Sequence, residues 1–160
     1  MLFFYNRTNG AAAIGSHSAN GFTTTKEFGQ GSFGHWTHIV SRDQLALFYN
    51  RNNGAAAIGN LTPSSFTTTK EFGQGSFGTW THVLNTGAGC FFYNQMTGAA
   101  AIGSFDAGQF TTTGSLPNGS LGEWTHIVAD GTTMLFYNRL DGSAAIATVT
   151  ATGLTTNTSF

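Results

Sequence analysis

The sequence predicts an all-β protein built from repeated four-stranded units, and three observations point to this class. The same short motifs return every 44 residues without drift. The runs between turns are rich in aromatic and β-branched residues, and 22 glycines separate them. No segment shows the 3.6-residue periodicity of an amphipathic helix. The motif Phe-Tyr-Asn begins at Phe4, Phe48, Phe92 and Phe136, and Trp-Thr-His begins at Trp36, Trp80 and Trp124. A constant period in this range is typical of one supersecondary unit used repeatedly.

The second copy shows the predicted elements in order. Four short β-favouring runs cover residues 45–50, 55–59, 66–72 and 80–84. The first two runs are joined by a turn that contains Asn53-Gly54, and Asn-Gly is a strong hairpin signal because both residues accept positive φ. A glycine-rich turn precedes the last run. Each repeat is therefore expected to form four antiparallel strands.

Both faces of the predicted strands are apolar, which favours a β-propeller. Adjacent side chains of a strand point to opposite faces of the sheet, so Leu47, Phe48 and Tyr49 place large apolar groups on both. Small sheets stacked face to face around an axis bury both faces, and about 40–50 residues for four strands is the propeller period. A β-trefoil-like barrel is the alternative, since it also uses four strands in a similar length.

The chain is expected to form a single repeat-array domain over residues 1–160. Its repeats cover 1–44, 45–88 and 89–132, with a partial repeat over 133–160. The partial repeat ends at Phe160, which aligns with Phe72, so fifteen strands are predicted in place of sixteen. An unfilled strand position beside a free edge invites pairing. Self-association is therefore expected, with a dimer as the predicted state.

The repeat resembles that of a known family. The succession Trp-Thr-His-Ile-Val, Leu-Phe-Tyr-Asn and Gly-Ala-Ala-Ala-Ile-Gly is similar to the repeat of secreted bacterial β-propeller modules, which include seven-bladed lectins. The resemblance covers the whole chain. It implies a propeller fold, an extracellular location, and binding of neutral glycans such as fucose or methylated sugars between blades. It also implies that the tryptophan strand comes first in each blade.

Composition excludes several function classes. Charged residues make up only 8% of the chain and the net charge is −1, whereas a nucleic-acid binder needs a basic footprint. No apolar run is long enough to span a membrane as a helix, so no membrane insertion is expected. Among the acidic residues only Glu27 and Glu71 occupy equivalent positions, and no nucleophile or metal-ligand motif is present. We therefore expect a protein that is not an enzyme and uses no metal or cofactor.

The candidate ligand-binding residues lie in the tryptophan motif and in the Phe-Tyr-Asn strand that follows it. Each tryptophan is either a core wedge or a stacking platform for a sugar. Each histidine either donates a hydrogen bond to a neighbouring blade's backbone or contacts ligand. The predicted set is Trp36, Trp80, Trp124, His38, His82, His126, Tyr49, Tyr93 and Tyr137. The sequence thus predicts a multivalent carbohydrate-binding protein, and the alternative is a structural or protein-interaction propeller without a small ligand.

Overall fold

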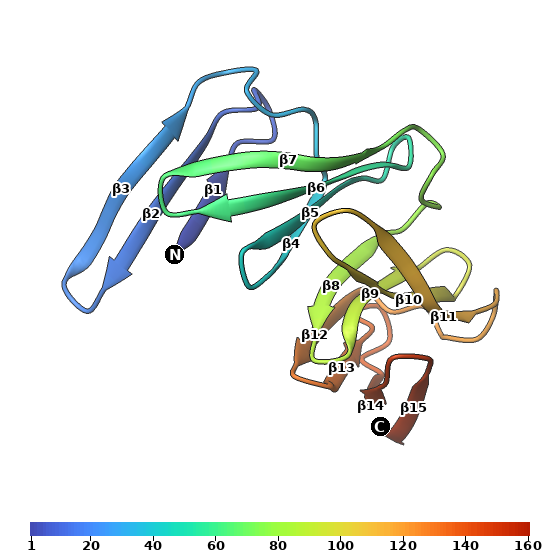
Figure 1. Ribbon diagram of the computed structural model, residues 1–160. Coiled ribbons are helices and arrows are strands. Elements are labelled where there is room, and N and C mark those ends of the chain that lie inside the picture. Colours follow the sequence, from blue (N-terminus) through green and yellow to red (C-terminus); the bar gives the residue numbers. More distant parts are fainter. The chain divides into compact units, whose positions relative to one another are not determined.

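A computed structural model describes all of residues 1–160 and contains fifteen strands and no helix (Figure 1). The all-β prediction and the number of strands are therefore confirmed. The first sheet contains β1 (Leu2–Tyr5), β2 (Ala12–Ser18) and β3 (Gly21–Phe28), and the second contains β4 (His38–Arg42), β5 (Leu45–Asn50), β6 (Ala55–Thr62) and β7 (Ser65–Phe72). The third contains β8 (His82–Thr86), β9 (Gly89–Asn94), β10 (Ala99–Phe105) and β11 (Phe110–Leu116), and the fourth contains β12 (His126–Asp130), β13 (Thr133–Tyr137), β14 (Ala144–Val149) and β15 (Leu154–Ser159).

Each sheet is an antiparallel meander in which strands that follow one another in the chain are neighbours. All four sheets are open, with two edge strands each, and the first sheet has three strands where the others have four. The first strand of each four-stranded sheet begins at the histidine of the Trp-Thr-His motif. A sheet therefore joins the last strand of one sequence repeat to the first three strands of the next.

The tryptophans themselves lie outside the strands, which corrects the predicted run over 80–84. β8 begins at His82, after Trp80. The Trp80 indole lies over Gly78: a Cβ atom built on Gly78 would lie 3.5 Å from the Trp80 ring. The ring therefore covers the backbone that precedes it, and strand pairing begins only after Trp80.

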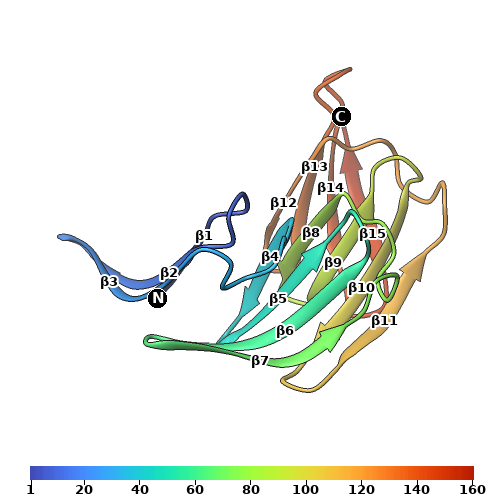
Figure 2. The same cartoon turned by 90° about the horizontal axis from the view of Figure 1, so that it is seen from above.

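The chain divides into two compact units, residues 1–77 (unit 1) and 78–160 (unit 2). Unit 1 contains the first and second sheets, and unit 2 contains the third and fourth (Figure 2). Within each unit the two sheets enclose one apolar core. In unit 1 the core includes Phe33, Phe48 and Ala57, and Phe3 and Tyr5 of the first sheet pack against it.

Unit 2 has the larger core. The third sheet contributes the fully buried Phe91 and Tyr93, and the fourth sheet contributes Met134, Phe136 and further residues from β14. The rings of Phe91 and Phe136 meet edge to face across the boundary, with centroids 6.1 Å apart. Within each unit one sheet thus lies against the other, which buries the apolar residues on the two facing sides.

A bulge recurs at one place in all four sheets, between the second and third strands of each repeat. The register shifts at Ile14/Gly15, Ile58/Gly59, Ile102/Gly103 and Ile146/Ala147. In the first three sheets a phenylalanine crosses the glycine: a Cβ atom on Gly103 would lie 2.3 Å from the Phe110 ring. In the fourth sheet the positions equivalent to the glycine and the phenylalanine carry Ala147 and Leu154, so the extra methyl group coincides with a smaller side chain at the phenylalanine position.

Candidate binding grooves at the sheet boundaries

The predicted histidines and tyrosines are brought together in pairs, each pair within one sheet. His38 lies opposite Tyr49, His82 opposite Tyr93, and His126 opposite Tyr137. The ring centroids are 5.7, 5.6 and 6.2 Å apart, respectively. The tryptophan motif and the Phe-Tyr-Asn strand after it are thus neighbours in a sheet, and the boundary between sheets is formed by other contacts.

In each unit a tyrosine hydroxyl links the two sheets across their boundary through two hydrogen bonds, an arrangement that we call a clamp. In unit 2 the Tyr93 hydroxyl donates to the Gly122 carbonyl and accepts a hydrogen bond from the Trp124 backbone N–H at 2.9 Å. In unit 1 the Tyr5 hydroxyl makes the corresponding bonds to Gly34 and Trp36. Burial raises the pKa of Tyr93 above its ordinary value, against the lowering effect of the Trp124 bond, and the charge of Glu123 adds to the rise. The phenol therefore acts as a neutral structural link.

In each unit a threonine hydroxyl forms a second hydrogen-bonded clamp between the two sheets, at the opposite end of their boundary. The Thr25 hydroxyl donates to the Pro63 carbonyl in unit 1, and the Thr113 hydroxyl donates to the Ala151 carbonyl in unit 2. The acceptors lie in the turns between the third and fourth strands of the neighbouring sheets' meanders, at equivalent positions. The sheet boundaries within the two units therefore share the tyrosine and threonine hydrogen bonds at equivalent positions.

The three histidines are the first residues of β4, β8 and β12, the opening strands of the four-stranded sheets. The Nδ1 atom of His82 is 2.9 Å from the Thr81 hydroxyl, and its Nε2 atom is 3.2 Å from the carbonyl oxygen of Thr125, which directly precedes β12 of the next sheet. This geometry matches the backbone-bonding interpretation of His82. His126 keeps the threonine bond at 2.9 Å but is exposed. No group of three His, Cys, Asp or Glu side chains is arranged to hold a metal ion.

The tryptophans pack partly into the cores. Their rings lie against the central phenylalanine of the adjacent strand, with centroid distances of 5.9 Å for Trp36–Phe48, 5.9 Å for Trp80–Phe92 and 5.8 Å for Trp124–Phe136. All three side chains remain partly accessible. Tyr49 and Tyr93 are fully buried, whereas Tyr137 is 41% exposed. Among the predicted residues, the tryptophans, the histidines and Tyr137 thus retain surface that a ligand can reach, whereas Tyr49 and Tyr93 do not.

A polar groove of about 370 Å³ lies between the first and second sheets, within unit 1. It is lined by Arg7, His35, Thr37, Arg51 and Asn52. His35 and Thr37 flank Trp36, and the other three residues belong to the turns that follow β1 and β5. The sequence reasoning overlooked this groove, although the arginine after Phe-Tyr-Asn recurs at Arg7, Arg51 and Arg139 and was a usable signal.

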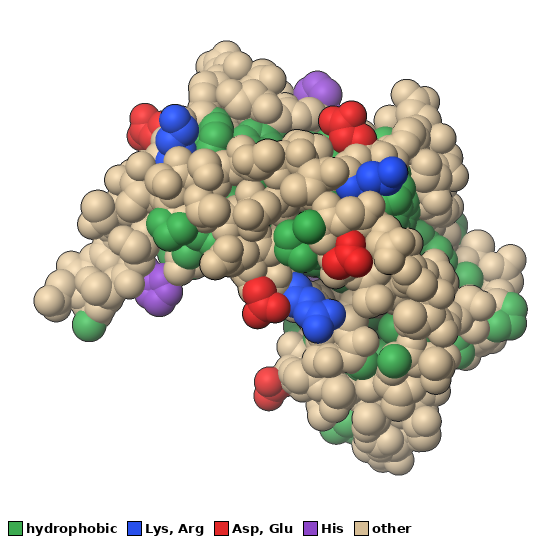
Figure 3. Space-filling model, viewed as in Figure 1, with side chains coloured by type: hydrophobic (Ala, Val, Ile, Leu, Met, Phe, Trp, Pro, Cys, Tyr) green, Lys and Arg blue, Asp and Glu red, His purple; other side chains and the backbone are tan.

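The equivalent positions of unit 2 differ in charge. They carry Gln95, Glu123, Thr125, Arg139 and Leu140. Unit 1 as a whole contains five Lys or Arg against three Asp or Glu, and unit 2 contains one against four. Charged side chains are sparse in the surface view of Figure 3. The groove of unit 1 is therefore locally cationic in a chain with little charge, and its counterpart positions in unit 2 are not.

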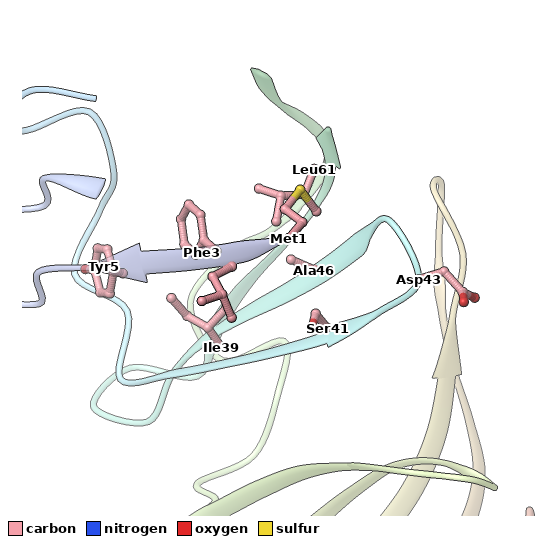
Figure 4. Close-up of a pocket in the computed structure, with 9 residues that line it drawn as sticks. Met1, Phe3, Tyr5, Ile39, Ser41, Asp43, Ala46 and Leu61 are labelled. Atoms are coloured by element: carbon pink, nitrogen blue, oxygen red, sulfur yellow. The ribbon is translucent and has the colours of Figure 1, made fainter. Parts of the chain in front are cut away.

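A second cavity in unit 1 is mainly apolar. It measures about 440 Å³ and lies beside the free edge of β1, between that strand and β4 to β6 of the second sheet. Phe3, Ile39 and Met1 face the same space in Figure 4. The wall also includes Ala46 and Leu61. This cavity has no polar side chain buried within it that points to a specific ligand.

Comparison of the sequence with protein-family models and with curated proteins finds no match. The fold includes no helix capable of crossing a membrane.

Proposed function

We propose that the protein is a multivalent carbohydrate-binding protein of the β-propeller type, with one weak site at each sheet boundary. The observation that carries this proposal is the duplication of the boundary. The same tyrosine and threonine clamps recur in unit 1 and unit 2, so the backbone frame beside the groove is repeated, with different groove side chains in the two units. Several weak sites on one molecule raise the overall affinity for a surface that carries many glycans.

The chemistry of the groove suits a sugar. Arg7, Arg51 and Asn52 offer hydrogen-bond donors for hydroxyl groups, and the neighbouring Trp36 keeps part of its indole accessible. Sugar sites combine a few oriented polar groups with an apolar surface against which a pyranose ring packs. Fucose and methylated sugars are the neutral ligands that we propose, because their methyl groups add apolar contact area.

Calorimetric titration with fucose, galactose and O-methylated sugars, preceded by a glycan array, tests this proposal. We expect binding with a stoichiometry of at least two sugars per chain. A single site per chain contradicts the repeated-boundary argument, and absence of binding to every glycan contradicts the lectin function.

The alternative function is a structural or protein-interaction propeller without a small ligand, and one observation favours it. The first and last sheets each leave apolar side chains exposed: Phe4 is 50% exposed and Val128 is 58% exposed. Apolar surface of this kind marks interaction sites. A silent glycan array together with concentration-dependent association supports this alternative.

A further inference from the structure

The last sheet exposes an apolar surface that crosses three of its strands. We call it the outer face of the last sheet, and it consists of His126, Val128, Leu135, Tyr137 and Ile146. The strand register places Val128 beside Leu135 and Leu135 beside Ile146, with His126 beside Tyr137. Val128 is 58% exposed, Leu135 40% and Tyr137 41%. Three large side chains thus stand together in solvent on one side of a sheet.

The same face of the preceding sheet is buried. Its equivalent residues Phe91, Tyr93 and Ile102 each have an exposed fraction of zero. Within unit 2 they are covered by the opposite side of the fourth sheet, chiefly by Met134 and Phe136. In the third sheet, this face is therefore covered by the next sheet along the chain, which is built from the next copy of the repeat.

The complementary surface is also exposed, at the other end of the chain. The outer face of the first sheet consists of Leu2, Phe4, Ala13 and Phe22. Leu2 is 40% exposed, Phe4 50% and Phe22 43%, and the rings of Phe4 and Phe22 meet edge to face at 5.0 Å. In the repeat register Leu2 and Phe4 correspond to Met134 and Phe136. The first sheet thus carries, uncovered, the residues with which the fourth sheet covers the third.

We propose that the outer face of the last sheet binds the outer face of the first sheet of a second copy of this chain. The contact repeats between chains the boundary that exists within each unit, with Leu135 and Tyr137 under Leu2 and Phe4. Each copy carries one face of each kind, so the interface is heterologous and head to tail. Such an interface forms a closed ring where the rotation between copies allows it, and an open chain otherwise. The proposal does not depend on sugar binding.

Light scattering and sedimentation over a range of protein concentrations test the assembly. The wild-type chain is expected to have at least twice the monomer mass. Leu135→Asp and Phe4→Asp each place a charge on one face, and each variant is expected to be monomeric at the same concentrations. Leu140→Asp is the matched control, because Leu140 is 74% exposed in a turn outside both faces, and it is expected to associate like the wild type.

Mixing the two monomeric variants tests the head-to-tail geometry. The Leu135→Asp chain retains an intact first-sheet face and the Phe4→Asp chain retains an intact last-sheet face, so the mixture is expected to form a one-to-one complex that grows no further. Three results overturn the proposal: a wild-type chain that is monomeric at all concentrations, as when the two faces close within one chain; a Phe4→Asp variant that still associates; or a mixture that stays monomeric. Far-ultraviolet circular dichroism and urea unfolding of each variant show whether it remains folded.

Discussion

In unit 1 the boundary between the two sheets contains a cavity, whereas the same boundary in unit 2 is packed. The clamps are alike in both units, but unit 2 has β8, and the first sheet of unit 1 has no strand in that position. Leu84 and Ala88, at and just beyond β8, pack against the core of unit 2, and Gly87 donates a backbone hydrogen bond to Gly131 at 2.7 Å. The strand that begins at the histidine of the Trp-Thr-His motif therefore fills the space between the two sheets, whereas the hydroxyl clamps link the sheets without filling it.

The largest expected difference between the units concerns one core phenylalanine. Phe91→Ala removes a fully buried ring from unit 2 and is expected to lower the free energy of unfolding by about 3–5 kcal/mol. Phe3→Ala removes the equivalent ring from unit 1, where it borders the cavity and is half-buried, and about 1–2 kcal/mol is expected from the lost burial. Urea unfolding followed by tryptophan fluorescence measures both. Equal losses at the two sites contradict the idea that the boundary of unit 1 is less well packed.

A second pair of variants compares Tyr93, whose hydroxyl links two sheets by hydrogen bonds, with Tyr137, whose hydroxyl is exposed. Tyr93→Phe leaves the Gly122 carbonyl and the Trp124 N–H without their partner, and about 1–3 kcal/mol of stability is expected to be lost. Tyr137→Phe removes an exposed hydroxyl, and a change within about 0.5 kcal/mol is expected. Thermal melts at a concentration where the chain is monomeric separate this effect from association. A stable Tyr93→Phe variant argues against the clamp.

The bulge offers a comparison between the third and fourth sheets. Gly103→Ala forces a methyl group against the Phe110 ring and the nearby Thr111 carbonyl, and overpacking of this kind costs about 1–3 kcal/mol. Adding Phe110→Leu reproduces the Ala147 and Leu154 pair of the fourth sheet. The double variant is expected to recover part of the loss in a melting experiment. If it is less stable than Gly103→Ala alone, the Ala147 and Leu154 pair is not a compensated exchange.

The smallest expected effect concerns the polar groove and rests on the proposed function. Arg51→Gln removes one of two arginines from the groove of unit 1, and a loss of about 1 kcal/mol in sugar binding, or roughly fivefold in affinity, is expected at that site. Arg139→Gln changes the equivalent residue of unit 2, so it serves as the matched control and is expected to leave the unit 1 site unchanged. Calorimetric titration of both variants decides. An Arg51→Gln variant that keeps the full affinity at every site excludes the groove of unit 1 as a sugar site.

Much of the local structure follows from the sequence. The constant spacing and the Asn-Gly turns located the strands β5, β6 and β7 to within a few residues, because alternation and turn chemistry are local properties of the chain. The start of β8 was placed too early at Trp80, because the indole's packing against its own turn is not visible in a β-favouring run. The candidate site was anticipated only in part. The aromatic residues were chosen for their chemistry, whereas Arg7, His35 and Arg51 converge only through the packing of two sheets.

The all-β class and the fifteen strands follow from local alternation and turn residues, and the repeat can be read directly from the spacing of its motifs. Which strands share a sheet depends on packing between distant segments, which places His82 and Tyr93 in one sheet with Trp124 across the boundary. Packing also sets which copies of a repeated residue are buried and hydrogen-bonded. Tyr93 and Tyr137 stand in the same motif, yet one is buried and bonded and the other is 41% exposed. A side chain is buried only where another sheet lies against it: the fourth sheet lies against Tyr93, and no sheet lies against Tyr137.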